Sequence, residues 1–339
     1  MIVKAMAPAR VCDFGGWTDT WFAKYGRVMN IAVDLYAKVV ITPHKEVGSG
    51  VRIIVQDYND VVEIPSDAKI FYNGKHDLLK AALNVIKVDD VDISIYSDLP
   101  PGCGTGSSAA VSVALIGALS QYAGMYLTPH EVAKLAHRLE TEELKIQSGV
   151  QDQVASAVGG IGFHEIDAYP HVASSPLRIK EDIALELESR LLVVYTGQSH
   201  LSSEVHEKVI SDYTSGKEKT IKAMDTLRET PVLAKSAIIR GDFNEFAEVM
   251  NLNTRAQKDL HPDITNENME RLESIARGAG AIGYKINGAG GGGSVTVLSK
   301  SKNAKEVETA IKNGGYKVLR SHLDTRGLVT WSLPDDGNY

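Results

Sequence analysis

Alternating hydrophobic and polar positions predict strands in the first half of the chain, and longer apolar runs predict helices between them. Residues 51–55 and 91–96 have the period-two or β-branched pattern of strands, and residues 26–43 contain two β-rich runs. The continuous apolar run Ala109–Leu119 predicts a buried helix. This half of the chain therefore mixes strands and helices.

A helix start lies at Thr128, where the side chain can cap the helix. Pro129 suits the first helical position and Glu131 completes a capping box, so the helix is expected to run to about Leu144. From about residue 184 the sequence becomes richer in amphipathic helix, and the last part alternates again. The predicted helices are 202–214, 218–239, 243–257, 266–278 and 304–313, and the predicted strands are 281–285, 294–298, 316–321 and 327–332.

Length and composition are those of an ordinary globular protein. The chain has 339 residues, of which 43% are hydrophobic and 23% charged, and it is long enough for two lobes because single cores seldom exceed roughly 250–300 residues. The N-terminus lacks the apolar core of a signal peptide, and no apolar run approaches the ~18 residues of a membrane span. Two cysteines, Cys12 and Cys103, argue against a disulfide framework and favour the cytoplasm.

The net charge of −7, from 36 basic and 43 acidic residues, does not favour a nucleic-acid partner. A membrane partner is not expected either. The expected partners are small molecules, and the chain is expected to be a monomer or a homodimer.

A glycine-rich loop joins the strand at 91–96 to the helix that follows it. Amide groups at a helix start lack intrahelical partners, glycine lets the backbone approach a phosphate, and serine adds a hydroxyl, so the loop predicts a nucleotide polyphosphate site. It has neither the lysine of a Walker loop nor the spacing of a dinucleotide fold, and a plain connecting turn is the alternative. Its candidate residues are Pro101, Gly102, Cys103, Gly104, Thr105, Gly106, Ser107 and Ser108.

This loop resembles the second motif of the GHMP kinases, the superfamily of galactokinase, homoserine kinase, mevalonate kinase and phosphomevalonate kinase. Residues 8–20 and 285–294 resemble the first and third motifs in the right order, so the resemblance spans nearly the whole chain. Thr105 replaces a usual leucine and Asn287 a usual threonine or serine, and neither change removes a charged catalytic group.

The resemblance implies an α+β fold of two lobes that uses ATP and Mg²⁺. The N-terminal lobe, residues 1–186, is expected to look like ribosomal protein S5 domain 2 and to carry the phosphate loop. The C-terminal lobe, residues 187–339, is expected to be a ferredoxin-like α/β sandwich.

Two residues are expected to carry the chemistry. Asp152 stands in the sequence GVQDQ, where galactokinase-like members have an aspartate that accepts the proton of the attacking sugar hydroxyl, an effect typically worth 10²–10⁴-fold in rate. Arg10 matches a basic residue of the first motif, and its guanidinium can hold Asp152 ionised and oppose phosphoryl charge. A helix cap for Asp152 and a surface ion pair for Arg10 are the alternatives.

Glu140 lies twelve positions before Asp152, a spacing that resembles that of the metal-binding glutamate of the family. It is expected to act with Ser108, because Mg²⁺ prefers hard oxygen ligands and keeps several waters. Glu142 and Glu143 are close rivals for this role.

Three residues of the first motif, Trp17, Thr18 and Asp19, resemble the sugar-contacting segment of galactokinases and fucokinases. Asp19 can accept hydrogen bonds from two hydroxyls, and Trp17 can pack on a sugar ring, although core packing would also explain it. In the third motif the substrate-binding candidates are Gly288, Ala289, Gly290 and Gly291, with a hinge turn as the alternative. Three histidines without metal-ligand spacing are expected to be structural or exposed: His164, His200 and His206.

The sequences GGWTDT, SGVQDQ and SPLR look most like the branch of heptose 7-phosphate kinases and fucokinases, which phosphorylate an anomeric hydroxyl and feed nucleotide-sugar synthesis. The first candidate substrate is D-glycero-D-manno-heptose 7-phosphate, with Arg178 and Lys180 as candidates for its phosphate. Fucose, glucuronic acid and other free sugars are the alternatives. A catalytically silent sugar-binding regulator, the alternative of another class, is disfavoured because Asp152, Glu140 and Ser108 are all present.

Overall fold

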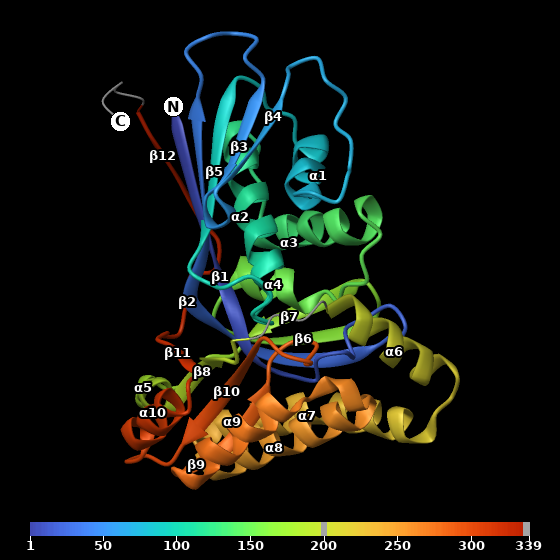
Figure 1. The fold of residues 1–339 in the computed structure, drawn as a ribbon, viewed down its shortest axis with the longest axis vertical. Helices are drawn as coiled ribbons and strands as arrows, with labels where there is room; N and C mark the ends of the chain where they lie inside the picture. Colours follow the sequence, from blue (N-terminus) through green and yellow to red (C-terminus); the bar gives the residue numbers. More distant parts are fainter. Residues whose placement is uncertain (198–201, 335–339) are drawn as a thin grey trace.

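The computed structural model describes residues 1–197 and 202–334, and the strands within them form one sheet of eight strands and one of four (Figure 1). The larger sheet has the order β12–β1–β2–β5–β3–β4, with β6 beside β2 and β7 beside β6. Its strands are β1 (Ile2–Phe14), β2 (Gly26–Pro43), β3 (Val51–Val55), β4 (Asp60–Ile64), β5 (Val91–Ser97), β6 (Ile161–Ala168), β7 (His171–Pro176) and β12 (Val329–Leu333).

The two β-rich runs predicted within residues 26–43 are one long strand, β2. Its first part, Gly26–Ile31, pairs with β6, and its last part, Ala37–Pro43, pairs with β5. The half-buried residues Asp34–Tyr36 lie between these two partners. A break in the hydrophobic pattern therefore marks a change of partner and not the end of the strand.

Helices α1 (Asp77–Val85), α2 (Ser107–Tyr122), α3 (Pro129–Arg138) and α4 (Gln151–Val158) pack beside the larger sheet (Figure 1). Leu115 and Leu119 of α2 are buried in one hydrophobic core with Val39 and Ile93 of the sheet. The predicted capping box at Thr128 is present, and a π-helical turn extends α3 to Glu143, so this prediction is confirmed.

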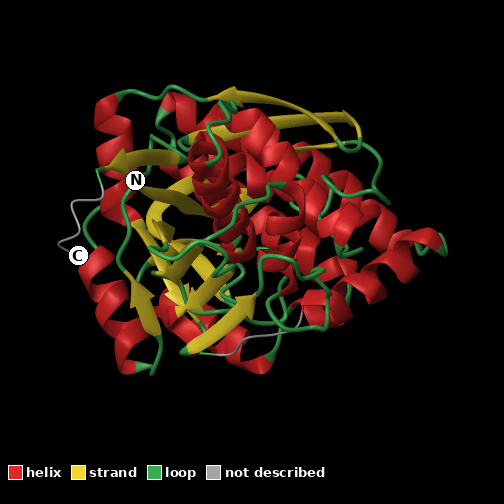
Figure 2. Cartoon of the chain, turned by 90° about the horizontal axis from the view of Figure 1, so that it is seen from above, coloured by secondary structure: helices red, strands yellow, loops and turns green. Residues whose placement is uncertain are grey.

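The smaller sheet is antiparallel, with the order β11–β8–β10–β9. Its strands are β8 (Leu191–Tyr195), β9 (Ala281–Ile286), β10 (Ser294–Ser299) and β11 (Lys317–Leu319), and its helices are α5 (Glu181–Arg190), α6 (Ser202–Thr214), α7 (Glu218–Arg240), α8 (Phe243–Leu260), α9 (Glu267–Gly278) and α10 (Ala304–Asn313). The five helices predicted between 202 and 313 are confirmed within a few residues, whereas β8 was not predicted. Figure 2 shows the strands in the middle of the molecule with helices around them.

The last strand, β12, belongs to the larger sheet and not to the C-terminal sheet that the sequence analysis expected. Ile2 pairs with Leu333 and Met6 with Val329, so β12 covers the outer edge of β1. This pairing satisfies edge hydrogen bonds that would otherwise face solvent. The chain thus returns to its first lobe at the end, and the boundary at 186/187 stays a prediction. No helix among the described residues is long and apolar enough to cross a membrane.

Candidate active site

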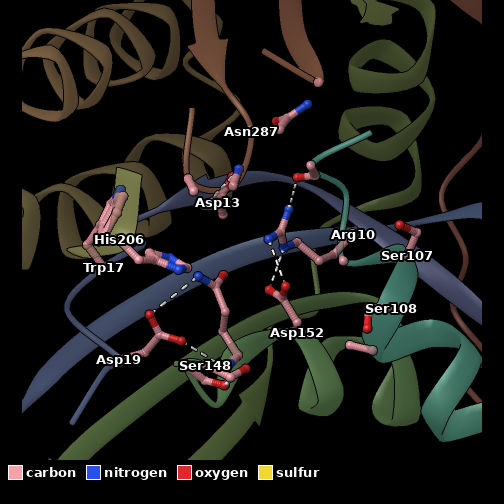
Figure 3. Close-up of a pocket in the computed structure, with 18 of the residues that line it drawn as sticks. Arg10, Asp13, Trp17, Asp19, Ser107, Ser108, Ser148, Asp152, His206 and Asn287 are labelled. Carbon is pink, nitrogen blue, oxygen red and sulfur yellow. Dashed lines mark hydrogen bonds and ion pairs between the residues drawn. The ribbon is translucent and has the colours of Figure 1, made fainter. Parts of the chain in front are cut away.

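A cavity of about 300 Å³ lies where three glycine-rich segments of the chain meet (Figure 3). One segment is the loop before α2, the second follows the end of β1, and the third joins β9 to β10. Residues near the start of α4 and in the turn before it complete the wall. The three sequence motifs, which are far apart along the chain, therefore line one cavity.

The loop before α2 depends on glycine for its shape. Gly102, Gly104 and Gly106 all have positive φ, which side chains disfavour. A Cβ on Gly106 would lie 3.3 Å from the Asp152 carboxylate, so glycine also leaves room for that group. The N-terminal turn of α2 thus faces the cavity with its backbone accessible, as an anion site requires.

Only part of the predicted phosphate loop lines the cavity. Gly102, Gly104, Gly106, Ser107 and Ser108 do so. The remaining predicted residues, Pro101, Cys103 and Thr105, are not among the lining residues, and the side chains of Cys103 and Thr105 are fully buried. Alternate residues of the turn therefore face the core.

Arg10 of β1 and Asp152 of α4 form a two-pronged ion pair inside the cavity. Arg10 Nε and Nη2 donate to the two carboxylate oxygens at 2.8 and 3.0 Å, and Nη1 donates to the carbonyl of Gly104 at 2.6 Å. Burial alone would lower the pKa of Arg10, but the nearby carboxylates of Asp152 and Asp13 outweigh it and raise the pKa. The α4 N-cap is Val150, without a side-chain cap bond, so Asp152 does not act as a helix cap.

Glu140 lies in the π-helical turn after α3 and is buried against the start of α2. It accepts hydrogen bonds from Ser108 Oγ at 3.2 Å, Ser148 Oγ at 2.6 Å and Gln153 Nε2 at 3.0 Å. Burial raises the pKa of Glu140 to about 7, against the effect of the Ser148 hydrogen bond. A carboxylate beside a hydroxyl at the edge of a phosphate loop fits the hard oxygen ligands that Mg²⁺ prefers.

The two rival glutamates point elsewhere. Glu142 forms an exposed ion pair with Arg138, and Glu143 accepts a hydrogen bond from the hydroxyl of Tyr72. Neither lines the cavity, whereas Glu140 does. In the described part of the chain, no group of three or more His, Cys, Asp or Glu residues is arranged to hold a metal ion.

Asp19 is buried at the other end of the cavity, beside the start of α4. It accepts a hydrogen bond from the backbone N–H of Gln151 at 3.0 Å. Burial raises the pKa of Asp19 to about 6, and the Gln151 N–H opposes this shift. A Cβ on Gly149 would lie 2.0 Å from an Asp19 oxygen, so this close approach requires glycine.

Trp17 and Thr18, the two residues before Asp19, differ in whether they line the cavity. Trp17 lines the cavity and has a φ of +82°, whereas Thr18 does not line it. The Thr18 hydroxyl donates to the carbonyl of Gly15 at 2.8 Å and accepts from the N–H of Arg27 at 3.2 Å. The structure therefore does not bring Thr18 to the predicted sugar site, because its hydroxyl is used to hold the loop.

The third motif reaches the cavity through Asn287, Gly288, Ala289, Gly290, Gly292 and Gly293. Gly291 does not line the cavity, and its N–H donates to the carbonyl of Ile264 at 2.7 Å. Asn287, which departs from the usual residue, accepts a hydrogen bond from the N–H of Cys12 at 3.0 Å and donates to Ser294 at 3.0 Å. Its amide thus connects the first and third motifs.

Sequence reasoning missed several residues that line the cavity, among them Asp13 and His206. Asp13 lines the cavity, accepts a hydrogen bond from the N–H of Gly288 at 3.2 Å and forms a fully buried ion pair with Lys285 at 3.5 Å. The available signal was a charged residue at the end of each of two apolar strands. His206 of α6 also lines the cavity and packs edge-on against Trp17, a position that the expectation of a structural or exposed residue did not include.

The sequence also singles out two other histidines and two cationic side chains: His164, His200, Arg178 and Lys180. His164 is buried and contacts Ser174 at 2.9 Å, as expected of a structural residue, and His200 lies outside the described residues. Arg178 and Lys180 lie between β7 and α5 and do not line the cavity.

Comparisons with known proteins point to one family along the whole chain. The model of the GHMP kinases N terminal domain matches residues 75–160, and that of the GHMP kinases C terminal matches residues 234–317. A mevalonate kinase from Thermococcus onnurineus is 32% identical, over 97% of this chain and 98% of that protein. A D-glycero-alpha-D-manno-heptose 7-phosphate kinase from Campylobacter jejuni is 29% identical, over 98% of this chain and 99% of that protein.

A solved structure, that of a D-glycero-D-manno-heptose 1-phosphate kinase from Bacteroides thetaiotaomicron, superposes with a TM-score of 0.81 at 23% identity. The similarity covers 98% of this chain and 100% of that one. At this identity it shows the fold, and it confirms the predicted two-lobed α+β architecture.

Proposed function

Because the chain belongs to the GHMP kinase family, we propose that it transfers the terminal phosphoryl group of ATP to a hydroxyl of a sugar. The observation that carries this proposal is the Arg10–Asp152 pair, which lies in one cavity with the N-terminal turn of α2. A phosphate-binding turn and a carboxylate base at one site are what a hydroxyl kinase requires.

In the proposed mechanism Asp152 accepts the proton of the attacking hydroxyl. Arg10 orients this carboxylate through its two hydrogen bonds, and its positive charge opposes the charge on the transferring group. The backbone of the loop before α2 binds the phosphates of ATP. Ser108 and Glu140 would hold Mg²⁺, which when bound neutralises phosphate charge.

At the acceptor end, Asp19 and Trp17 bind the sugar, and the phosphorylated position is the anomeric hydroxyl. The first candidate substrate is D-glycero-D-manno-heptose 7-phosphate, in keeping with the Campylobacter jejuni relative. A free sugar such as fucose is a second candidate, because Arg10 is the one arginine or lysine among the described residues that line the cavity, and it is engaged by Asp152. A 7-phosphate would therefore have to find its cationic partners outside this cavity.

The test is an ADP-release assay over free sugars and sugar 7-phosphates, run with the parent enzyme and with Asp152→Asn. We expect ADP release that depends on one sugar or a small group of them and that the variant lacks. Sugar-independent ADP release, or none with any sugar, would contradict the proposal.

A further inference from the structure

His206 occupies a position in the cavity that the proposed mechanism does not use. It comes from α6, in the second half of the chain, and it lines the same cavity as Asp152 and Asp19. Within the residues that the structure describes, its imidazole makes no hydrogen bond. Burial lowers the pKa of this imidazole to about 4. At neutral pH the ring is therefore uncharged and has one N–H donor and one nitrogen acceptor to offer.

Trp17 is the nearest partner of this histidine, and it also has an unused polar group. The two rings meet edge to face, with centroids 4.7 Å apart and an interplanar angle of 84°. The indole N–H of Trp17 is buried and has no hydrogen-bond partner in the described part of the chain. This nitrogen is closed off from the cavity, so Trp17 offers the cavity its ring, and His206 is the member of the pair with polar atoms to offer.

The backbone supports the same interpretation. Trp17 has a φ of +82°, which is a strained conformation for a bulky side chain. Backbone strain of this kind persists only where the surrounding structure holds the residue in place, and strained residues cluster at active sites and ligand-binding sites. Trp17 is fixed by the fold, with its carbonyl accepting a hydrogen bond from Thr20 Oγ1 at 2.7 Å.

The position of His206 is fixed as well, by the helix that carries it. Val205 and Val209 of α6 are buried in one cluster with Trp17 and Phe22. Seven residues after His206, on the same face of the helix, Tyr213 packs against Phe22 with ring centroids 5.5 Å apart. The segment that contains Trp17 and Phe22 therefore packs against α6. Figure 3 shows His206 beside Trp17.

We propose that His206 is a specificity-determining residue that, held against the Trp17 ring, hydrogen-bonds the hydroxyl groups of the acceptor sugar across the cavity from Asp152. A neutral imidazole suits a polyhydroxylated ring, because each hydroxyl both donates and accepts. The inference rests on the proposed sugar kinase function and adds to it the residues that read the acceptor.

The test measures binding separately from catalysis. D-glycero-D-manno-heptose 7-phosphate and L-fucose are each titrated calorimetrically into the parent enzyme, and ADP is titrated as the ligand of the other subsite. The variants are His206→Phe, which keeps a ring against Trp17, His206→Ala, which adds no bulk, and His206→Gln, which restores one donor and one acceptor. Glu207→Gln, at an exposed neighbouring position of α6, is the matched control.

We expect His206→Phe and His206→Ala to weaken binding of the recognised sugar by about tenfold or more, as loss of a buried hydrogen bond does. His206→Gln should recover part of the affinity, and the Kd for ADP should stay within about twofold. Glu207→Gln should match the parent.

Three results would overturn this inference. Unchanged sugar affinity in the Phe and Ala variants would remove His206 from the acceptor site, and the proposed function would stand. A joint loss of sugar and ADP binding with a lower melting temperature would make His206 a structural residue. If the parent bound neither these two sugars nor any other sugar of the ADP-release assay, the proposed function would fail first and the role of His206 with it.

Discussion

Arg10 donates two hydrogen bonds, of 2.8 and 3.0 Å, to the two oxygens of Asp152, and so joins β1 to the first turn of α4. The third prong of the guanidinium, Nη1, reaches the carbonyl of Gly104 in the phosphate loop. One arginine thus fixes the distance between the proposed base and the loop that binds ATP. A base held in this way is oriented before either substrate arrives.

Asp152→Asn keeps the size of the side chain and removes the proton acceptor. We expect kcat to fall by at least ~100-fold, because general-base catalysis is worth that much, while the Kd for ATP stays nearly unchanged. Steady-state kinetics and a nucleotide titration on the same preparation measure the two quantities. Turnover close to that of the parent would remove Asp152 from the mechanism.

Ser108→Ala and Glu140→Gln each delete one oxygen of the proposed Mg²⁺ site. Both variants should need more Mg²⁺ for half-maximal activity and should turn over more slowly, because the protein supplies few ligands to the ion. Glu142→Gln, which alters only an exposed ion pair, is the control. Mg²⁺ titrations of the two site variants that superpose on the parent would show that the metal lies elsewhere.

Asp19 should make the stability of the protein depend on pH. Its pKa rises from 3.8 to about 6 on folding, so the folded state binds the proton more tightly than the unfolded state between these values. The contribution of Asp19 to the free energy of unfolding should therefore fall by about 2–3 kcal/mol as the pH rises from 4 to 7. Denaturant unfolding of the parent and of Asp19→Asn measures it as the difference between the two curves. A difference that does not change with pH would contradict the assignment.

The buried Asp13–Lys285 pair should hold the first and third motifs together. Lys285→Met leaves the Asp13 carboxylate buried without its cation, and we expect a loss of roughly 3 kcal/mol in the free energy of unfolding. Adding Asp13→Asn should return part of that loss, because the double variant has no unpaired buried charge. Additive losses in a double-mutant cycle would show that the two side chains do not interact.

Local chemistry in the sequence predicts many elements of this fold, but it misses β1, β4, β7, β8 and α1, and it does not predict which elements pair. The capping box at Thr128 and the helices from 202 to 313 are encoded within short windows, and the structure contains them. The pairing of β12 with β1 joins residues more than three hundred positions apart, so no window contains it. The pairing of β2 with β5 at one end and with β6 at the other also joins distant residues, so no short window of the sequence predicts it.

The candidate site shows the same limit. Family motifs identify Asp152, Arg10 and Glu140, and the structure places all three at one cavity. Asp13 and Lys285 are separated by 272 positions, and only the folded chain makes them a pair. His206 stands in an ordinary amphipathic helix, where nothing in the sequence indicates that it meets Trp17.

The position of the phosphate in the product tests the central claim most directly. The parent enzyme is incubated with ATP, Mg²⁺ and the sugar that supports ADP release, and the product is examined by phosphorus NMR with proton coupling. We predict a phosphate resonance coupled to the anomeric proton, because Asp152 is proposed to activate the anomeric hydroxyl. A newly formed phosphate, absent from the starting sugar, that is coupled to a proton on any other carbon would contradict the account.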